Sequence, residues 1–377
     1  MSERFYYTII TKNKNIILRG LLLSMLIKYQ PLLVGLILII VLTFNSVILT
    51  YASKSILLND DWHHSRLLND LKNFALSKIN DDRKKYNLPL LFLSNNTAAQ
   101  IHANELLRTK TISHLSLEGF KPYMLYSFYN GTGYVQQNIG QISYVITNGT
   151  QNYYPVSDQC YDQKRFYCPV IDRFKAISGL QHSMMYNDKL CCNDGHKNNI
   201  LNKYHTHVSI GIAYNDYYFV MVQNFENHYL RPDFTIIKND DAIKLEARIN
   251  DPDNFNFEIN HVSFFLDEFP TKLDYEKNRD KNSYDFGDLK LMVSKPLPPD
   301  LEYVQEKEDS TYRIIEANKW ELNEEDINLE IQIPDTLNVK DKILTMVLYA
   351  QTVGVEDNVI GEESDYVPLT SYTFFNS

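Results

Sequence analysis

The pattern of hydrophobic and polar residues divides the chain into an apolar N-terminal run, a helical part and a part rich in strands. Residues 32–51 form a run without a single charge. At 1.5 Å per residue, a helix of this length spans roughly the 30 Å core of a bilayer. Basic residues precede the run with almost no acid, which leaves residues 1–31 in the cytoplasm and the rest outside. We expect a single-pass signal anchor; a signal peptide cut after Ala52, giving a secreted protein, is the alternative.

Two amphipathic helices are predicted after this run. The first extends from Ser53 to about Asn87, with residues 52–64 as a membrane-proximal stalk in which His63 and His64 are solvated rather than metal ligands. Its apolar positions recur in steps of three and four residues: Leu67, Leu71, Phe74, Ala75 and Ile79. The second starts at a cap, Ser94 or Asn95, and ends near Lys110.

Strands are predicted from period-two alternation further along the chain. The run Val208–Ala213 alternates, turns at Asn215 and Asp216, and returns over Tyr217–Gln223 as a hairpin. Four more runs alternate in the last third: residues 243–249, 327–333, 342–353 and 366–375. Short strands with polar turns between them predict an antiparallel β-sandwich of immunoglobulin-like architecture there.

Charge separates the two halves of the exported part. The 377 residues carry a net charge of −10, but residues 231–377 hold 15 Lys and Arg against 32 Asp and Glu. Such a shift predicts a domain boundary near Arg231. It also argues against nucleic acid as a partner, because a phosphate-binding surface needs a basic face.

One stretch carries candidate chemistry, from Met184 to Tyr214. Gly195 allows a sharp turn, His196 follows at the edge of a short helix, and a strand begins about a dozen residues later. This order places an imidazole at the rim of a sheet. The stretch resembles the GHRxNILxPxxxxxGxG element of the CAP superfamily (cysteine-rich secretory proteins, antigen 5, pathogenesis-related 1) in its bacterial and archaeal form.

Three further segments resemble the same family. Residues 79–91 (INDDRKKYNLPLL) are similar to the opening of its bacterial domains, and residues 113–119 (SHLSLEG) to its FSHxSxDG segment. Asn138-Ile139 stands where the family has GENI, with Gln137 in place of the glutamate. The resemblance implies an α-β-α sandwich. The expected fold class is α+β. The chain is expected to divide into a cytoplasmic segment (1–31), a transmembrane anchor (32–51), a stalk (52–64), a CAP domain (65–230) and a β-sandwich domain (231–377).

The resemblance also implies a cleft lined by four residues: His114, Gln137, Asp188 and His196. His114 and His196 would be the ligands of a Zn-like divalent cation. Binding should be weak, because the amide of Gln137 lacks the charge of the family's carboxylate. The pair His102 and Glu105 is interpreted as core packing beside a surface carboxylate, and the acidic turn at residues 251–254 as solvated rather than as a Ca²⁺ site.

The expected function is a non-catalytic binding module at the cell membrane, with a lipid-like or cell-envelope ligand in the cleft. Two alternatives stay open: a metal-dependent hydrolase of extracellular or envelope substrates, and a purely structural surface protein. Signatures of nucleophilic catalysis are missing from the sequence, which disfavours an enzyme.

The cysteines and sequons agree with export. Four cysteines are expected to form two disulfides in an oxidising compartment: Cys160, Cys168, Cys191 and Cys192. Because neighbouring cysteines pair only with strain, each of Cys191 and Cys192 is expected to bond Cys160 or Cys168. Three N-x-T sequons make the protein a candidate glycoprotein: Asn95, Asn130 and Asn148.

Overall fold

The computed structural model describes most of the chain after residue 64: residues 65–147, 153–155, 160–162, 165–166, 168–231, 235–239, 242–303, 311–334, 337, 339, 341–353 and 366–375. Contacts divide the chain into Met1–Leu67 and Leu68–Ser377, and the second unit is described below. The predicted anchor at 32–51 and the stalk lie outside the described residues. Within the residues described, no helix combines the length and the apolar character needed to cross a bilayer.

The first helix is tied to the rest of the fold by Arg83. Residues 65–85 are helical, and Leu71, Ala75 and Ile79 are at most 1% exposed, as the predicted apolar stripe requires. The fully buried Arg83 donates from its guanidinium to the carbonyls of Pro89 (2.7 Å), Ile200 (2.8 Å) and Asn202 (2.8 Å). A positively charged donor thus holds the end of this helix to the segment that follows His196.

A four-stranded sheet forms the centre of residues 68–230, in the order β1-β7-β8-β2. Its strands are β1 (Phe92–Leu93), β7 (His207–Tyr214), β8 (Tyr218–Asn227) and β2 (Tyr134–Ser143). The predicted hairpin is formed by β7 and β8, and β2 pairs antiparallel with β8 over its whole length, whereas the short β1 is parallel to β7. Among the residues that the structure describes, β2 is thus an edge strand, and no strand pairs with its outer side.

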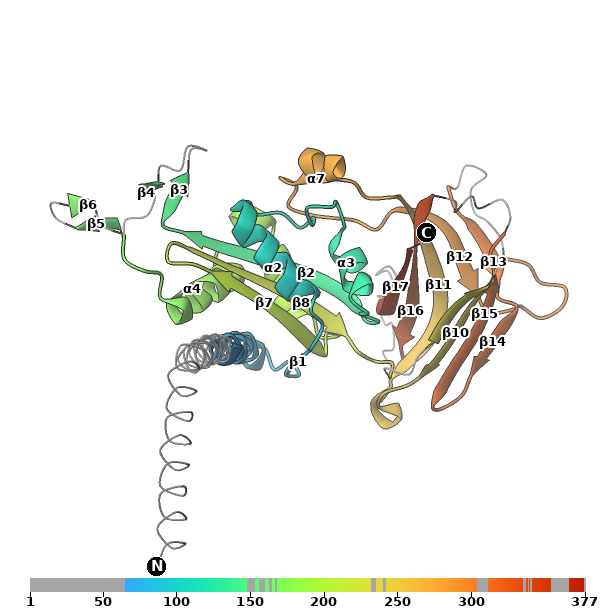
Figure 1. Ribbon diagram of the computed structural model, residues 1–377. Helices are drawn as coiled ribbons and strands as arrows, with labels where there is room; N and C mark the ends of the chain where they lie inside the picture. The colour runs from blue at the N-terminus through green and yellow to red at the C-terminus, as the bar shows by residue number, and fades with distance from the viewer. Residues whose placement is uncertain are drawn as a thin grey trace, which may run out of the picture. The chain divides into compact units, whose positions relative to one another are not determined.

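Helices cover both faces of this sheet (Figure 1). On one face, α2 (Ala98–Thr109) lies so close to β7 that a Cβ at Gly211 would sit 1.9 Å from the carbonyl oxygen of Ala99. On the other face, Leu180 and Met184 of α4 (Arg173–Tyr186) pack against Gly140 of β2. The result is a mixed α+β fold with helical layers on either side of a sheet, as expected.

Shorter helices complete this part: α3 (Pro122–Phe128), α5 (Lys189–Cys192) and α6 (Gly195–Leu201). The cap predicted for α2 is wrong, because its N-cap is Thr97. The side chains of Ser94 and Asn96 instead accept from the backbone two residues on, at 3.3 and 2.9 Å. They form the turn that precedes the helix rather than its cap.

The predicted disulfide pairing is also wrong. Cys160 bonds Cys168, and Cys191 bonds Cys192. Between the first pair, β5 (Tyr161–Asp162) and β6 (Arg165–Phe166) form a hairpin that brings the two Cα atoms to 4.0 Å. Because Cys160 and Cys168 bond to each other, they are not available to Cys191 and Cys192, and these two form the second disulfide. A second short pair, β3 (Val145–Thr147) with β4 (Tyr153–Pro155), precedes this hairpin.

Two sheets make up the C-terminal third of the chain. The first has the order β14-β15-β10-β9, with β14 (Lys319–Leu322), β15 (Asp326–Gln332), β10 (Ala242–Arg248) and β9 (Thr235–Asn239). The second has the order β13-β12-β11-β16-β17, with β13 (Arg313–Glu316), β12 (Asp288–Ser294), β11 (Phe257–Glu268), β16 (Lys342–Thr352) and β17 (Val367–Phe375).

The two sheets share one hydrophobic core. Leu245 and Leu329 from the first sheet and Phe264 and Met346 from the second are all fully buried in it. The four alternating runs of the sequence lie in strands β10, β15, β16 and β17. The pairing is not antiparallel throughout, however, because β13 runs parallel to β12. A short 3-10 turn (Pro252–Asn254) and α7 (Lys272–Asn278) interrupt the strands.

Strand β17 joins the C-terminal sheets to the mixed α+β part. Ser371 Oγ donates to the carbonyl of Gly133 (3.2 Å), and the backbone N–H of Thr373 donates to Ser127 Oγ (3.2 Å). Phe375 contacts the rings of Phe120 and Phe128 at centroid distances of 5.8 and 5.5 Å. This interface, with α3 on one side, is apolar at its centre and hydrogen-bonded along β17.

Candidate functional site

The imidazole of His114 is held by the side chain of Gln137. Gln137 lies on β2 and donates from Nε2 to Asn224 Oδ1 (3.0 Å) on the neighbouring strand β8. Its Oε1 therefore faces His114 and accepts from Nδ1 at 3.0 Å. An uncharged amide is therefore sufficient to fix the orientation of the His114 ring and to direct its Nε2 away from β2.

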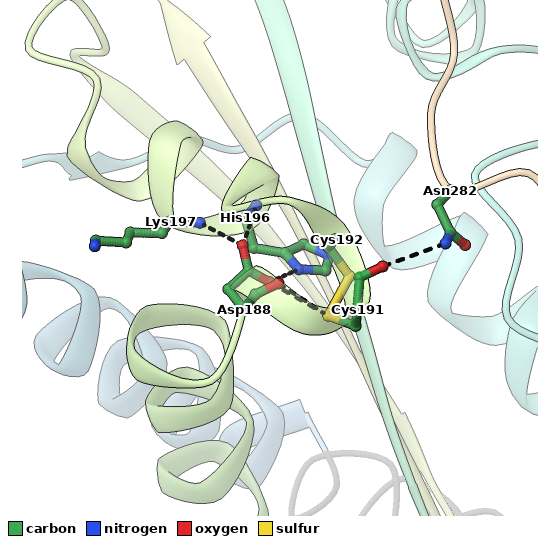
Figure 2. The surroundings of a disulfide bond; sticks show 6 residues. All are labelled: Asp188, Cys191, Cys192, His196, Lys197 and Asn282. Carbon is green, nitrogen blue, oxygen red and sulfur yellow. Dashed lines mark hydrogen bonds and ion pairs between the residues drawn. A yellow bond between two sulfur atoms is a disulfide. The ribbon is translucent and has the colours of Figure 1, made fainter.

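The imidazole of His196 is held in the same way by Asp188. The carboxylate is 2% exposed and accepts from His196 Nδ1 (2.6 Å), from the backbone N–H of His196 (2.8 Å) and from that of Lys197 (3.1 Å). Figure 2 shows these bonds converging on one side chain. Asp188 thereby orients the ring and also stabilises the start of α6, where backbone N–H groups have no helical partner.

Edge strand β2 links the two histidines. Successive side chains of a strand point to opposite faces. Gln137 therefore holds His114 on one face, whereas Asn138 donates from Nδ2 to the carbonyl of His196 (3.0 Å) on the other. The two rings reach round the same open edge from opposite sides. The sequence pattern predicts both histidines, and the alternation of two adjacent strand residues brings them together.

Both histidines line the same hollow. A cavity of about 340 Å³ is lined by His114, Gln137, Asn138 and His196, and an adjoining one of about 330 Å³ by His114, Asp188 and His196. All four predicted cleft residues thus border one or both of these cavities. The walls are otherwise mixed, with amide groups facing aromatic rings.

One wall of the hollow comes from the C-terminal part of the chain. The segment between α7 and β12 borders the hollow: residues 282–286 line the first cavity and residues 279–282 the second. Tyr284 lies with its ring centroid 5.2 Å from that of His114 and accepts at Oη from the backbone N–H of Gln137 (3.0 Å). That N–H is on the open edge of β2, so a tyrosine hydroxyl takes the place of a neighbouring strand.

Contacts to Lys121 and Tyr123 hold this wall near Phe286. Asp267 of β11 accepts from Lys121 Nζ (2.7 Å) and from Tyr123 Oη (2.9 Å). Phe286 packs on the ring of Tyr123 at 4.6 Å between centroids. This wall is not predicted from the sequence, because residues 279–286 carry no motif or periodicity. The available signal is the pair of aromatic residues in an otherwise polar segment, Tyr284 and Phe286.

Burial keeps His114 neutral. It lowers the pKa of the imidazole to about 4, outweighing the opposite effect of the hydrogen bond to Gln137. A neutral ring with its Nδ1–H donated to Gln137 carries its lone pair on Nε2, the nitrogen available to a metal ion, and the backbone of Asn282 lies within hydrogen-bonding reach of the same ring. The cleft therefore offers an uncharged imidazole near neutral pH.

A second group of possible ligands adjoins the cleft. One donor atom each from Asp188, Cys191, Cys192 and His196 lies within 4.8 Å of the others. In the disulfide form the sulfurs are bonded to each other and cannot act as thiolates. The carboxylate and the imidazole are then the only members able to bind a cation.

The remaining predicted residues have other surroundings. His102 is buried and its Nε2 lies 2.8 Å from the carbonyl oxygen of Ser113, which agrees with a core role and positions the segment before His114. Asp251 is exposed and accepts from Asn254 Nδ2 (2.8 Å), within a turn. Asn95 and Asn130 are exposed, as glycosylation requires, and Asn148 lies outside the described residues.

Comparison with known proteins identifies the family of residues 76–225. They match the family model described as the cysteine-rich secretory protein family, CAP. A solved structure of an extracellular protein containing a SCP domain from Bacillus anthracis str. Ames is 19% identical, with a TM-score of 0.29; the match covers 43% of this chain and 42% of that chain. No curated protein matches the chain. The family match confirms the resemblance found in the sequence.

Proposed function

We propose, from the premise that residues 76–225 are a CAP domain, that the chain is a non-catalytic binding module. It acts outside the cytoplasm from a membrane anchor at residues 32–51. Its cleft holds a divalent cation weakly through His114 and His196, and the aromatic and amide walls accept a lipid-like or cell-envelope ligand. The observation that carries the proposal is the matched pair of hydrogen bonds, His114 to Gln137 and His196 to Asp188, around one cavity.

The donor set fits a borderline cation such as Zn²⁺. Imidazoles are ligands that such an ion prefers, and His114 and His196 both have Nδ1 committed to an oxygen acceptor, as metal-binding histidines usually do. Gln137 contributes no charge, and the Asp188 carboxylate is occupied by hydrogen bonds from His196 and from the start of α6, so the imidazoles of the oxidised protein hold the cation without an anionic ligand. We therefore propose weak binding, by the imidazoles alone, with Gln137 and Asp188 as positioning residues.

The hydrolase reading has less support. Water activation would require a general base or a bound ion with room for the substrate beside it. The ring of Tyr284 stands 5.2 Å from that of His114 and occupies the space next to it. A ligand that enters the cleft meets a wall already hydrogen-bonded to the edge of β2. This arrangement suits binding and retention better than turnover.

The test is Zn²⁺ binding by the full chain in detergent with its disulfides intact, measured by isothermal titration. We expect micromolar or weaker affinity that falls about tenfold or more in His114→Ala and in His196→Ala. His182→Ala, an exposed histidine of α4, is the matched control and should bind as the wild type does. Equal binding by all four proteins would refute the cation site and favour a structural role. Zn²⁺-dependent cleavage of envelope peptides, abolished by His196→Ala, would establish the hydrolase instead.

A further inference from the structure

A disulfide between neighbouring cysteines, Cys191 and Cys192, lies beside the cleft. Cys191 is exposed and Cys192 partly exposed, and both belong to the single-turn helix α5. Cys192 also lines the same cavity as His114 and His196. A disulfide can be reduced only where a thiolate can reach one of its sulfurs. This pair meets that condition on the protein surface, next to a group of metal-binding side chains.

The backbone gathers these side chains into one place. Asn193 and Asp194 both have left-handed backbone angles, with φ of 51° and 62°, a conformation that non-glycine residues seldom adopt. They turn the chain back directly after Cys192. His196 then returns to Asp188, so four possible ligands from nine consecutive residues meet within 4.8 Å. Figure 2 shows the sulfurs beside the carboxylate, and Cys191 Sγ lies 3.6 Å from Asp188 Oδ1.

We propose that reduction of the Cys191–Cys192 disulfide creates a thiolate site for a soft divalent cation, completed by Asp188 and His196. The site shares His196 and Asp188 with the cleft of the proposed function and adds the two cysteines as its own ligands. It does not use His114. The ligands would be two thiolates, one carboxylate and one imidazole, a set that suits Zn²⁺ or Cd²⁺ and excludes Mg²⁺ and Ca²⁺.

The chemistry balances with a dithiol as the reductant. Its thiolate attacks one sulfur of the pair, a mixed disulfide forms, and the second thiol of the reductant displaces the protein sulfur. The dithiol is oxidised to a disulfide, and the protein gains two electrons and two protons as Cys191-SH and Cys192-SH. Binding of M²⁺ then releases both thiol protons. The cation neutralises charge that would otherwise gather on two sulfurs and a carboxylate.

The fold permits this change at small cost. A bond between neighbouring residues closes almost no chain loop, so breaking it returns little entropy to the unfolded state. The Cys160–Cys168 bond closes a longer loop with a sequence separation of 8 and lies outside the four-ligand group. The Cys160–Cys168 disulfide therefore closes a hairpin, whereas the Cys191–Cys192 disulfide determines whether two thiolate ligands are present.

The experiment is a Cd²⁺ titration of the full chain, before and after treatment with a dithiol that is then removed by anoxic gel filtration. We expect ultraviolet sulfur-to-cadmium charge-transfer absorption only in the reduced protein, with affinity about tenfold or more above that of the oxidised protein. Cys191→Ser/Cys192→Ser should lose both the band and the gain. Cys160→Ser/Cys168→Ser, the matched control, should keep both, and so should His114→Ala.

Other outcomes separate this proposal from the proposed function. A sulfur band that persists in Cys191→Ser/Cys192→Ser, or a reduced wild type without such a band, would overturn the thiolate site. Loss of Zn²⁺ binding by the oxidised protein alone would leave the thiolate site intact and remove the imidazole site. Circular dichroism of each variant checks that α5 and α6 remain folded, and Asp188→Asn should weaken Cd²⁺ binding while retaining the sulfur band.

Discussion

The backbone N–H of Gln137 donates to Oη of Tyr284, a residue 147 positions further along the chain, at 3.0 Å. One hydrogen bond thus joins the open edge of the CAP sheet to the segment that forms a wall of its cleft. Because the same glutamine holds His114 through its side chain, the position of the C-terminal wall and the orientation of the imidazole are set by a single residue.

Removal of the Tyr284 hydroxyl should destabilise the protein. Tyr284→Phe leaves the Gln137 N–H without a partner in a buried place, at a cost of about 1 to 3 kcal/mol. Urea unfolding followed by circular dichroism measures the free energy. The control is Tyr303→Phe, whose hydroxyl donates to the Lys295 carbonyl at an exposed site (2.7 Å) and should cost less than about 1 kcal/mol. Equal losses in the two variants would show that the edge of β2 does not depend on Tyr284.

Arg83→Met should be among the most damaging substitutions outside the cleft. It removes three donors from the carbonyls of Pro89, Ile200 and Asn202 and replaces them with an apolar side chain. Unpartnered buried carbonyls make a loss of about 3 kcal/mol or more the expected result. Arg108→Met, an exposed position in the last turn of α2, should change the unfolding free energy by less than about 0.5 kcal/mol. A mild effect of Arg83→Met would mean that water replaces the guanidinium.

Two neighbouring acids on β11 should behave differently. Asp267 has a side chain 10% exposed and accepts from both Lys121 and Tyr123, so Asp267→Ala leaves the phenol without its acceptor and the lysine with the Asp285 carbonyl alone, and should cost about 2 to 3 kcal/mol. Glu268 pairs with Lys342 at 2.6 Å with its side chain 78% exposed, so Glu268→Ala should cost less than about 1 kcal/mol. Unfolding in urea compares them directly. The reverse order would contradict a fixed cleft wall.

Acid should weaken the fold before its carboxylates titrate. Burial lowers the pKa of each of four histidines to about 4: His114, His205, His207 and His261. Since an unfolded histidine titrates near 6.5, the unfolded chain binds these protons first, and the stability that they contribute is complete above about pH 6.5 and is lost as the pH falls toward 4. The fully buried His205 alone should account for about 3 kcal/mol.

The measurement is the urea midpoint between pH 7.5 and 5, a range in which ordinary carboxylates stay ionised. The free energy should fall with a slope that approaches 1.4 kcal/mol per pH unit for each contributing histidine. His205→Gln should lower the slope as well as the stability. A flat profile down to pH 5 would show that the buried rings gain protons without cost in the folded state.

Much of the CAP domain follows from the sequence, because local patterns determine it. The spacing from Gly195 to the strand at Val208 places His196, and the alternation of residues 208–223 gives the hairpin. Asp188 and Gln137 are also found at the cleft, although the structure gives them the task of orienting rings. Arg83 explains why the opening segment at residues 79–91 accompanies the histidine element, since its guanidinium binds the chain just beyond it.

The remaining features depend on tertiary contacts that no local pattern records. The sequence separates residues 231–377 by charge, yet Tyr284 from that part completes the cleft. The cysteine pairing was wrong because a hairpin at residues 161–166 brings Cys160 and Cys168 together. The predicted N-cap of α2 is wrong because Ser94 and Asn96 form the turn before the helix. Each difference depends on a contact that the spacing of hydrophobic and polar residues does not record.

The open edge of β2 also determines how the chain can be cut. A fragment excised at Leu230 would keep every CAP motif but would lose the tyrosine and the β17 side chains that cover this strand and the adjoining turn. Exposed strand edges pair with those of neighbouring molecules. Such a fragment should self-associate even though its histidines remain intact. On this view the acidic C-terminal sheets keep the CAP domain soluble by covering the exposed edge of β2.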